Sequence, residues 1–435
     1  MATLAAAYAI TACAPVTKPP AQIASPVSAI DELAVQYVKL SLEIGAQEDG
    51  YIDAYYGPDE WKPVGGSPPK ERAQLLAETR QLLSAVQDAA TQSRNPDTLR
   101  RTRFLAGQLR AAETRLLMAN GQKFSFAEEA ERLFAVRPLL EPLSSYDDDL
   151  AALEKLLPGE GSLSDRIEAA QAKVTIAPDR LQPVFDRAIA ECKARTEAYI
   201  DLPDGESFKM EFVTGKSWSG YNYYQGSYNS LIQINTDLPI RLSRAVDLGC
   251  HEGYPGHHAL NMLLEQRLSI AKGWREFSVY PLYSPQSLIA EGSANYGIEL
   301  AFPGDEKMEF ERDILAPLAG IAAADAERSA KLTQLLTSLS GARLTIAQLY
   351  LDAKIGREEA IALAQKYQLL TRPRAEQSIR FTEQYRSYVI NYGLGLDMVR
   401  AYIEAGGADV ALRWKRMEAV ISEPTLPADL AVAAN

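Results

Sequence analysis

The stretch His251-Glu252-Gly253-Tyr254-Pro255-Gly256-His257-His258 contains every histidine of the chain and leads into the apolar run 259–264. Three histidines within eight positions of a 435-residue chain are not a random scatter. Pro255 cannot lie undisturbed in a helix, because its ring clashes with the carbonyl group four residues earlier, which is that of His251. The sequence therefore predicts a helix that unwinds or bulges at the Pro255-Gly256 step.

The spacing of the histidines resembles, but does not match, the zinc-peptidase motif H-E-x-x-H, in which two imidazoles hold Zn²⁺ and the glutamate is the general base. The second histidine follows His251 by six residues (His257) or by seven (His258). In an undisturbed helix, seven residues return to within about 20° of the same face, which would pair His251 with His258. If the Pro-Gly step loops out two residues, His257 takes the second motif position. We favour His257 as the ligand, and His258 is the alternative.

A third metal ligand is expected at Glu291, which lies on a predicted helix 34 residues after His257. A catalytic zinc usually has three protein ligands and one open position. We therefore expect one Zn²⁺ per chain, held by His251, His257 and Glu291. Asn295, one turn after Glu291, is expected to hydrogen-bond a ligand histidine.

These residue types predict a hydrolytic mechanism. Zinc lowers the pKa of its bound water towards about 7, and Glu252 would accept the proton as the water attacks a carbonyl group. A tyrosine hydroxyl would then hydrogen-bond the oxyanion. Tyr392 is the first candidate, and Tyr385 and Tyr388 are its alternatives.

Candidate substrate contacts lie outside the histidine stretch. The predicted strand 230–235, which ends at Asn235, would align an extended peptide if it is an exposed sheet edge. Tyr223 and Tyr224 either line a cleft or fill the core. Arg386 is a candidate partner for a substrate carboxylate, with a surface salt bridge as its alternative. We therefore predict substrate contacts at Tyr223, Tyr224, Asn235 and Arg386.

The fold class predicted is mainly α. Helical periodicity dominates residues 29–200 and returns from Pro239 to about Ala405. Between these regions, the aromatic segment 221–228 and the alternating run 230–235 predict a β-hairpin or small sheet just before the metal-binding helix. The segment Tyr51–Trp61 is expected to be a loop. We divide the chain into residues 1–28, an N-terminal helical region 29–200 and a metal-binding catalytic region 201–435, the last two being alternatively one continuous domain.

Residues 1–28 are predicted to be a lipoprotein signal and tether. Ile10-Thr11-Ala12-Cys13 resembles a bacterial lipobox, whose cysteine is lipidated, and the proline-containing segment 16–26 would be the tether. This predicts a periplasmic or outer-membrane-anchored protein of the cell envelope, attached to the membrane only through Cys13. The three cysteines are too few and too scattered for a disulfide framework, so Cys192 and Cys250 are expected to be buried packing residues.

Composition excludes several classes of protein. Hydrophobic residues make up 47% and charged residues 23%, which is typical of a globular protein and excludes wholesale disorder. No apolar stretch of about 18 residues or more is present, which excludes a membrane-spanning helix. Lys and Arg number 45 against 57 Asp and Glu, a net charge of −12 that argues against nucleic acid as a partner.

Three strings together resemble the bacterial domain-of-unknown-function family numbered 885. They are H-E-G-Y-P-G-H-H from His251, E-G-S-A-N-Y-G-I-E-L from Glu291, and Tyr392-Gly393-Leu394-Gly395. The resemblance covers residues 251–395 and extends to the N-terminal half only in helical character. It implies a multi-helix fold of the gluzincin metallopeptidases, whose ligands are two histidines and a glutamate, and an envelope lipoprotein.

The same resemblance points to one of the two paired histidines. The family accepts tyrosine where this chain has His258, which indicates His257 as the ligand. The chain departs from the family in having Ser293 in place of a tryptophan, and Tyr388 in place of a glutamine. These departures affect the lining of the substrate site more than the metal.

The function predicted is that of a zinc-dependent metallopeptidase acting on a peptide substrate. Two alternatives remain open. The first is a non-catalytic envelope lipoprotein that binds peptides or cell-wall fragments, and the second is a metallohydrolase of non-peptide amides or esters. Glu252 separates the first from an enzyme, because a binding protein needs no general base between metal-binding histidines.

Overall fold

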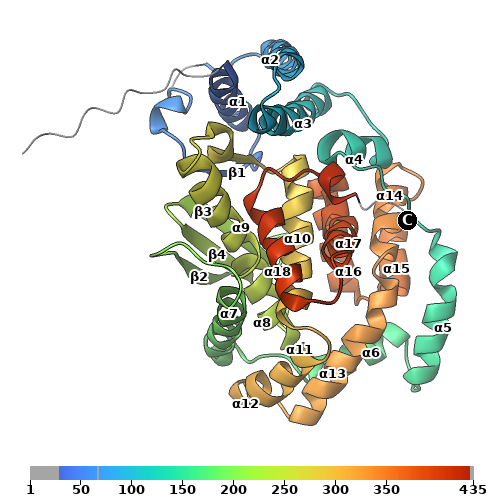
Figure 1. The fold of residues 1–435 in the computed structure, drawn as a ribbon. Helices are drawn as coiled ribbons and strands as arrows, with labels where there is room; N and C mark the ends of the chain where they lie inside the picture. Colours follow the sequence, from blue (N-terminus) through green and yellow to red (C-terminus); the bar gives the residue numbers. More distant parts are fainter. Residues whose placement is uncertain (1–28, 66–67, 432–435) are drawn as a thin grey trace, which may run out of the picture.

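The computed structural model describes residues 29–65 and 68–431, so Cys13 and the predicted signal and tether lie outside the described residues. The described chain is mainly helical, with two small sheets, and the three-stranded sheet immediately precedes the histidine stretch (Figure 1). The predicted fold class, mainly α with a small sheet before the metal-binding helix, is therefore confirmed.

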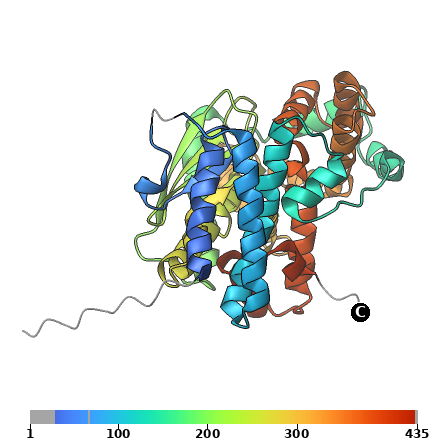
Figure 2. The same ribbon diagram turned by 90° about the horizontal axis from the view of Figure 1, so that it is seen from above.

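The N-terminal region is a series of helices, three of which pack side by side (Figure 2). Asn95 begins one of them by accepting a hydrogen bond from the backbone N–H of Thr98 at 3.0 Å, with Pro96 in the first turn. The helices are α1 (Ala29–Gly45), α2 (Arg72–Gln92), α3 (Pro96–Ala119), α4 (Phe126–Phe134), α5 (Asp147–Leu156), α6 (Leu163–Ala172) and α7 (Leu181–Glu197), of which α1, α2 and α3 are the three packed side by side.

The predicted hairpin is present as β3 (Gly220–Gly226) and β4 (Asn229–Asn235), which are antiparallel. A third strand, β2 (Ser207–Val213), pairs with β4 in parallel, so the strand order is β2-β4-β3. The strand 230–235 is therefore central, and the expectation that it is an exposed edge is wrong. Both of its backbone edges are already hydrogen-bonded, and β3 is an edge strand that contacts the histidine stretch.

A second sheet was not expected from the sequence. β1 (Ile52–Tyr55) pairs antiparallel with β5 (Val279–Pro281), so the segment Tyr51–Trp61 is not wholly a loop. The expectation failed because a four-residue strand carries little local signal and its partner lies far away in the chain.

The helix of the histidine stretch is interrupted where Pro255 predicted. The helix α8 (Ser243–Leu248) continues as a π-helical turn, η4 (Gly249–Gly253), and α9 (His257–Leu264) begins only after the Pro-Gly step. Gly256 allows the chain to fold back closely, because a Cβ at this position would lie 1.8 Å from the carbonyl oxygen of His251. This close return brings the start of α9 beside η4.

The C-terminal helices surround the central helix α10 (Pro285–Ala301), with the three-stranded sheet on one side and α14 to α17 on the other (Figure 1). A Cβ at Gly292 of α10 would lie 2.4 Å from the carbonyl oxygen of Gly395 on α17, so two glycines permit this close crossing. The crossing places Tyr392 against α10. The remaining helices are α11 (Glu306–Phe310), α12 (Ala316–Ala319), α13 (Ala323–Leu336), α14 (Ala342–Leu351), α15 (Arg357–Tyr367), α16 (Arg372–Tyr385), α17 (Ile390–Glu404) and α18 (Val410–Ser422).

A disulfide corrects the prediction for two cysteines. Cys192 on α7 and Cys250 on η4 form a disulfide with their Cα atoms 5.4 Å apart. They are 58 residues apart in the chain, and only the packing of α7 against η4 brings them together. The spacing of cysteines in the sequence gave no signal of this pairing.

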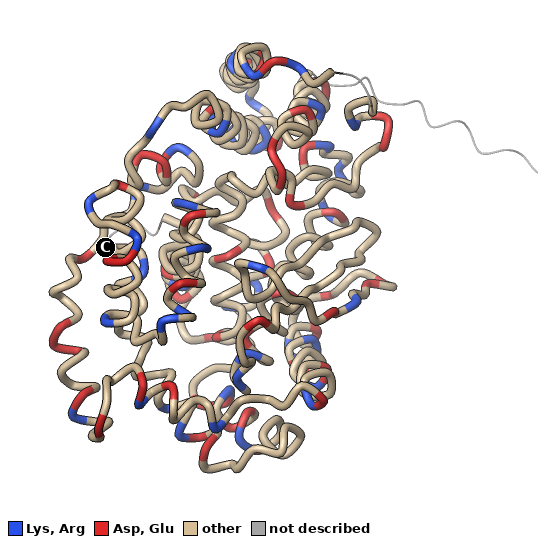
Figure 3. Tube along the Cα trace, turned by 180° about the vertical axis from the view of Figure 1, so that it is seen from behind, with Lys and Arg blue, Asp and Glu red and all other residues tan. Residues whose placement is uncertain are grey.

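The largest apolar cluster extends from Ile30 to Leu430 and includes side chains from both sides of residue 200. Lys and Arg positions are interspersed with Asp and Glu positions along the described helices (Figure 3). Among the described residues, no helix combines the length and the apolar character needed to cross a membrane.

Candidate metal centre

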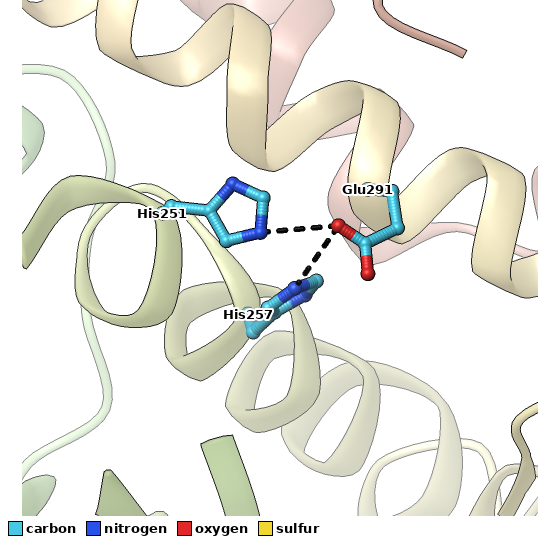
Figure 4. A group of neighbouring side chains, drawn as sticks. All are labelled: His251, His257 and Glu291. Carbon is cyan, nitrogen blue, oxygen red and sulfur yellow. Dashed lines mark ion pairs between the residues drawn. The ribbon is translucent and has the colours of Figure 1, made fainter. Parts of the chain in front are cut away.

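Three side chains from separate elements converge at the end of the histidine stretch (Figure 4). His251 extends from η4, His257 from the first position of α9 and Glu291 from the middle of α10. Glu291 Oε2 lies 3.1 Å from His251 Nε2 and 3.7 Å from His257 Nε2. One ligand atom from each residue lies within 4.8 Å of the others, so the three can hold a metal ion.

Asn295 fixes the orientation of the first imidazole. The Nδ1 atom of His251 lies 3.1 Å from Asn295 Oδ1, which can only accept a hydrogen bond. The Nδ1 atom therefore carries the proton, and Nε2 presents its lone pair towards Glu291. The amide of Asn295 in turn donates to the carbonyl oxygen of Tyr392 at 3.3 Å. This is the contact with a ligand histidine that the helical spacing predicted.

The carboxylate of Glu291 divides its two oxygens between different partners. Oε1 accepts a hydrogen bond from the hydroxyl of Tyr388 at 2.7 Å, while Oε2 is buried and has no hydrogen-bond donor among the described residues. A buried carboxylate oxygen without a donor, facing two imidazole nitrogens, fits a divalent cation that accepts nitrogen and oxygen ligands. Tyr388 thus holds a candidate ligand.

Charge coupling within the group is strong. Burial acts to raise the pKa of Glu291, but His257 and His251 outweigh burial and hold this pKa well below its usual range. Burial acts to lower the pKa of His257, but Glu291 outweighs burial and raises it to about 9. The negative charge of Glu291 therefore favours a positive charge at this position.

Glu252 lies beside the three residues. Its backbone carbonyl group is hydrogen-bonded, whereas one of its carboxylate oxygens is not. Its carbonyl oxygen accepts a hydrogen bond from the Asn222 amide at 2.7 Å. Its Oε2 atom is buried and has no hydrogen-bond partner among the described residues. Gly220 on β3 makes room for the carboxylate, because a Cβ there would lie 2.7 Å from Glu252 Oε1. Burial raises the pKa of Glu252, which suits a group that accepts a proton near neutral pH.

The group opens into a cavity of about 1010 Å³. The lining includes Glu252 and all three tyrosines that the sequence offered as oxyanion donors, Tyr385, Tyr388 and Tyr392. The ring of Tyr392 stacks near the His251 imidazole, with centroids 6.3 Å apart. Tyr392 is therefore close enough to act on a group bound at the candidate centre.

Two polar residues that the sequence did not single out also line the cavity. The hydroxyl of Tyr221 on β3 donates a hydrogen bond to Asp53 Oδ1 on β1. Burial raises the pKa of Asp53 to about 6, although the Tyr221 hydrogen bond acts in the opposite direction. The sequence gave no signal for Asp53, because its strand was expected to be a loop.

The structure does not bring the predicted substrate contacts into the cavity lining. Tyr224 donates its hydroxyl hydrogen bond to Glu265, and Asn235 donates to backbone carbonyls of the preceding loop at 2.9 Å. Tyr223 packs against the neighbouring ring of Tyr221, with centroids 4.4 Å apart. These side chains contact other partners, and Trp218, Tyr221 and Asn222 line the cavity instead.

Arg386 is committed elsewhere in the structure. Its Nε atom donates to Glu129 Oε2 at 2.8 Å, and Arg386 is absent from the lining of the large cavity. Glu129 is buried and also accepts from Ser387, so Arg386 neutralises a buried carboxylate. The guanidinium satisfies Glu129 and is not free to meet a substrate.

His258, the alternative second ligand, lies outside the group. Its imidazole is 0% exposed, and its Nδ1 atom lies 2.8 Å from Ser230 Oγ. Its Nε2 atom lies 2.9 Å from Glu206 Oε2. Both nitrogens of His258 are thus occupied, and its neighbour His257 is the one that meets His251 and Glu291.

Comparisons with known proteins extend only to the fold. No family model matches the sequence, and no curated protein matches it. The described similarity to the family numbered 885 therefore remains a resemblance. The structure of "the putative lipoprotein from Colwellia psychrerythraea" aligns with 85% of this chain and 69% of that chain, with a TM-score of 0.51 and 13% identity. This likeness indicates a shared fold.

A second solved structure aligns more loosely. The M32 carboxypeptidase from Deinococcus radiodurans R1 covers 90% of this chain and 88% of its own, with 13% identity and a TM-score of 0.34. A superposition this loose carries no structural argument. The case for a metal centre therefore depends on the geometry of His251, His257 and Glu291.

Proposed function

We propose that this protein is a zinc-dependent hydrolase, most specifically a metallopeptidase. The observation that carries the proposal is the convergence of His251, His257 and Glu291 beside the buried carboxylate of Glu252 in one large cavity. Two imidazoles and one carboxylate form a ligand set that suits zinc and leaves a position open. When bound, zinc would polarise a substrate carbonyl group and make water more acidic.

In this proposal, Glu252 is the general base. Its Oε2 atom is buried and lacks a hydrogen-bond donor among the described residues, so it is available to take a proton from water. Burial raises its pKa, so the carboxylate holds the proton more readily than an exposed glutamate. The same carboxyl group would then pass the proton to the leaving amine.

Tyr392 is proposed to hydrogen-bond the oxyanion, because its ring lies against His251 in the cavity lining. An extended peptide would pair with the edge strand β3 (Gly220–Gly226), in place of the central strand first expected. Gly220, at the start of this strand, lies directly against the Glu252 carboxylate. Main-chain pairing there would hold a peptide bond next to the base.

The proposed location is the bacterial cell envelope, with lipidation at Cys13. The disulfide between Cys192 and Cys250 supports this, because disulfides persist in oxidising compartments such as the periplasm. Mass spectrometry of the protein recovered from membranes would test the location. A lipid-modified N-terminal cysteine is expected, and an unmodified, soluble chain would contradict it.

The function is tested with metal analysis and a mixed peptide library, using wild type, Glu252→Gln and Glu299→Gln. Glu299 is the matched control, since it also lines the cavity but pairs with Arg400 at 2.6 Å. We expect about one zinc per chain in all three, and turnover reduced by about 10²- to 10⁴-fold only in Glu252→Gln.

Other outcomes separate the alternatives. Full turnover by Glu252→Gln would show that the base is wrongly assigned. A wild type that holds metal but cleaves nothing would favour the peptide-binding lipoprotein. Cleavage restricted to esters or non-peptide amides would favour a metallohydrolase of non-peptide substrates.

A further inference from the structure

The cavity contains one basic side chain whose charge is not matched within the described chain. Arg343 on α14 lines the cavity, and its buried Nε atom has no hydrogen-bond partner among the described residues. No carboxylate of residues 29–65 or 68–431 forms an ion pair with it. The Arg343 side chain is half-buried, so part of its hydration is lost without a carboxylate to replace it, and this loss is unfavourable.

The other basic residues of the same cavity are paired. Arg244 lies 3.5 Å from Asp247, and Lys307 lies 2.5 Å from the same carboxylate. Arg374 lies 3.5 Å from Glu168 and donates to the Pro239 carbonyl oxygen at 3.3 Å. Arg343 therefore differs from each of them in having an unused charge.

The surroundings of Arg343 position it towards the candidate metal centre. Its guanidinium carbon lies 5.3 Å from the centroid of the Phe381 ring and 5.5 Å from that of the Tyr392 ring. The Tyr392 ring itself stacks near His251 at 6.3 Å. One aromatic ring thus separates the guanidinium from a candidate metal ligand, and two rings restrict how the guanidinium can turn.

Burial lowers the pKa of Arg343, and Tyr392 and then Glu291 act in the opposite direction. Glu291 is the carboxylate proposed to hold the metal. A bound dication would take up that negative charge, so a substrate must supply the anion that Arg343 lacks. The planar fork of a guanidinium matches a carboxylate in shape and hydrogen-bonding pattern.

We propose that Arg343 binds the C-terminal carboxylate of the substrate, so that the enzyme cleaves peptides close to a free C-terminus. The inference rests on the proposed function and adds the substrate class to it. The Arg343 guanidinium carbon and the His251 ring lie 5.5 Å and 6.3 Å from the Tyr392 centroid, so they are at most about 12 Å apart, and an extended residue spans about 3.5 Å. The carboxylate therefore lies within about three residues of the scissile bond. The reaction itself is hydrolysis, in which water adds across the peptide bond.

The test compares matched ligands that differ only at the C-terminus. N-acetyl-dialanine and N-acetyl-dialanine amide are titrated calorimetrically into zinc-loaded Glu252→Gln, which is expected to bind without turnover. Both are also offered to the wild type as substrates. We expect the acid to bind, and to be cleaved, at least about 100-fold better than the amide.

The arginine is then tested directly. Arg343→Met should reduce binding of the acid by about 100-fold, leave the amide unchanged and retain its zinc. Arg343→Lys should bind the acid with an affinity between those of the unsubstituted arginine and Arg343→Met, because lysine keeps the positive charge but lacks the planar fork of the guanidinium. Arg374→Met is the matched control, a cavity arginine whose charge is already paired, and it should keep the preference for the acid.

The outcomes distinguish this inference from the proposed function. Equal binding of acid and amide overturns the role of Arg343, and cleavage of both by the wild type would leave the peptidase intact. An acid preference that depends on Arg343 shows that this residue binds the carboxylate, and if nothing is cleaved, the peptidase and the cleavage that the inference adds to it are both overturned. The acid–amide comparison needs no variant of Arg343, so it stands even if Arg343→Met does not fold.

Discussion

His257 and His258 are adjacent in the chain, and their imidazoles enter different environments. His257 faces a carboxylate oxygen that has no hydrogen-bond donor among the described residues, at the wall of a large cavity. His258 is 0% exposed and lies between Ser230 and Glu206. Successive helical residues point about 100° apart, so the first turn of α9 serves both environments.

The two environments differ in the groups that face the carboxylate. We call Glu206, Ser230, Tyr254 and His258, together with Lys193, the Glu206 cluster. In it, Glu206 accepts from His258 and from the Tyr254 hydroxyl, and it pairs with Lys193 at 2.5 Å. Both carboxylates have a buried oxygen without a hydrogen-bond partner among the described residues, Oε1 in Glu206 and Oε2 in Glu291. The ammonium group of Lys193 faces the Glu206 oxygen, whereas only imidazole nitrogens face the Glu291 oxygen, which leaves Glu291 able to bind a cation.

The largest expected effect is on zinc affinity, and the same substitution at each of the two histidines distinguishes their roles. His257→Phe should weaken zinc binding by roughly 10³-fold, since it removes one of three ligands, while the protein remains folded. His258→Phe should keep about one zinc per chain and lose about 3 kcal/mol of unfolding free energy, because Glu206 and Ser230 lose a buried partner. Metal analysis and denaturant unfolding of both variants provide the readouts. The reverse pattern would exchange the roles of the two residues.

The disulfide links the two environments through α7, which carries both Cys192 and Lys193. Removing it, with Cys192→Ala and Cys250→Ala together, should lower the free energy of unfolding by about 4 kcal/mol for a loop of 58 residues. Denaturant unfolding with and without a reductant measures this loss. Reduction of the wild type should give the same loss, and no effect of reductant on the wild type would contradict a disulfide that constrains the fold.

Asn295 belongs to the metal side of the comparison alone. Asn295→Ala should weaken zinc binding by about 10- to 100-fold, because His251 loses the acceptor that fixes its protonated nitrogen. Competition with a chelator measures the affinity. Asn261→Ala is a suitable control, since that amide donates to the His257 carbonyl oxygen at 3.0 Å and touches no imidazole. Equal losses in both variants would indicate a general loosening of the site.

The smallest expected effect depends on pH and belongs to the Glu206 cluster. Burial acts to raise the pKa of Glu206, but hydrogen bonds from His258, Lys193 and Tyr254 outweigh burial and lower it to about 2. A depressed pKa contributes stability above the ordinary value of 4.5, and this stability is lost as the pH falls towards about 2. Glu206→Gln should therefore cost about 1.5 kcal/mol at pH 7 and almost nothing near pH 2, as measured by denaturant unfolding. A cost that does not vary with pH would contradict an ionised Glu206.

Sequence reasoning reached the parts of the site that depend on local chemistry. Pro255 cannot continue a helix, and this alone predicted the interruption that brings His257 beside His251. Helical spacing placed Asn295 one turn beyond Glu291, where it contacts His251. In both cases the relative positions of the residues are fixed within a single helical turn.

The parts that failed depend on pairings across the chain. Asp53 lies on a strand whose partner follows more than two hundred residues later, and Cys192 meets Cys250 only through helix packing. Arg386, a candidate substrate contact with a salt bridge as its alternative, forms the salt bridge, but its partner Glu129 lies on a distant helical segment and is buried. No local pattern encodes such contacts, so the sequence could identify the chemistry of the candidate metal ligands but not the lining around them.

The most direct test of the central claim is a crystal structure of the protein with zinc, with anomalous diffraction measured on both sides of the zinc absorption edge. The account predicts one strong anomalous peak within bonding distance of the Nε2 atoms of His251 and His257 and the Oε2 atom of Glu291. A peak at Glu206 and His258, or no peak at the three residues at saturating zinc, would contradict it.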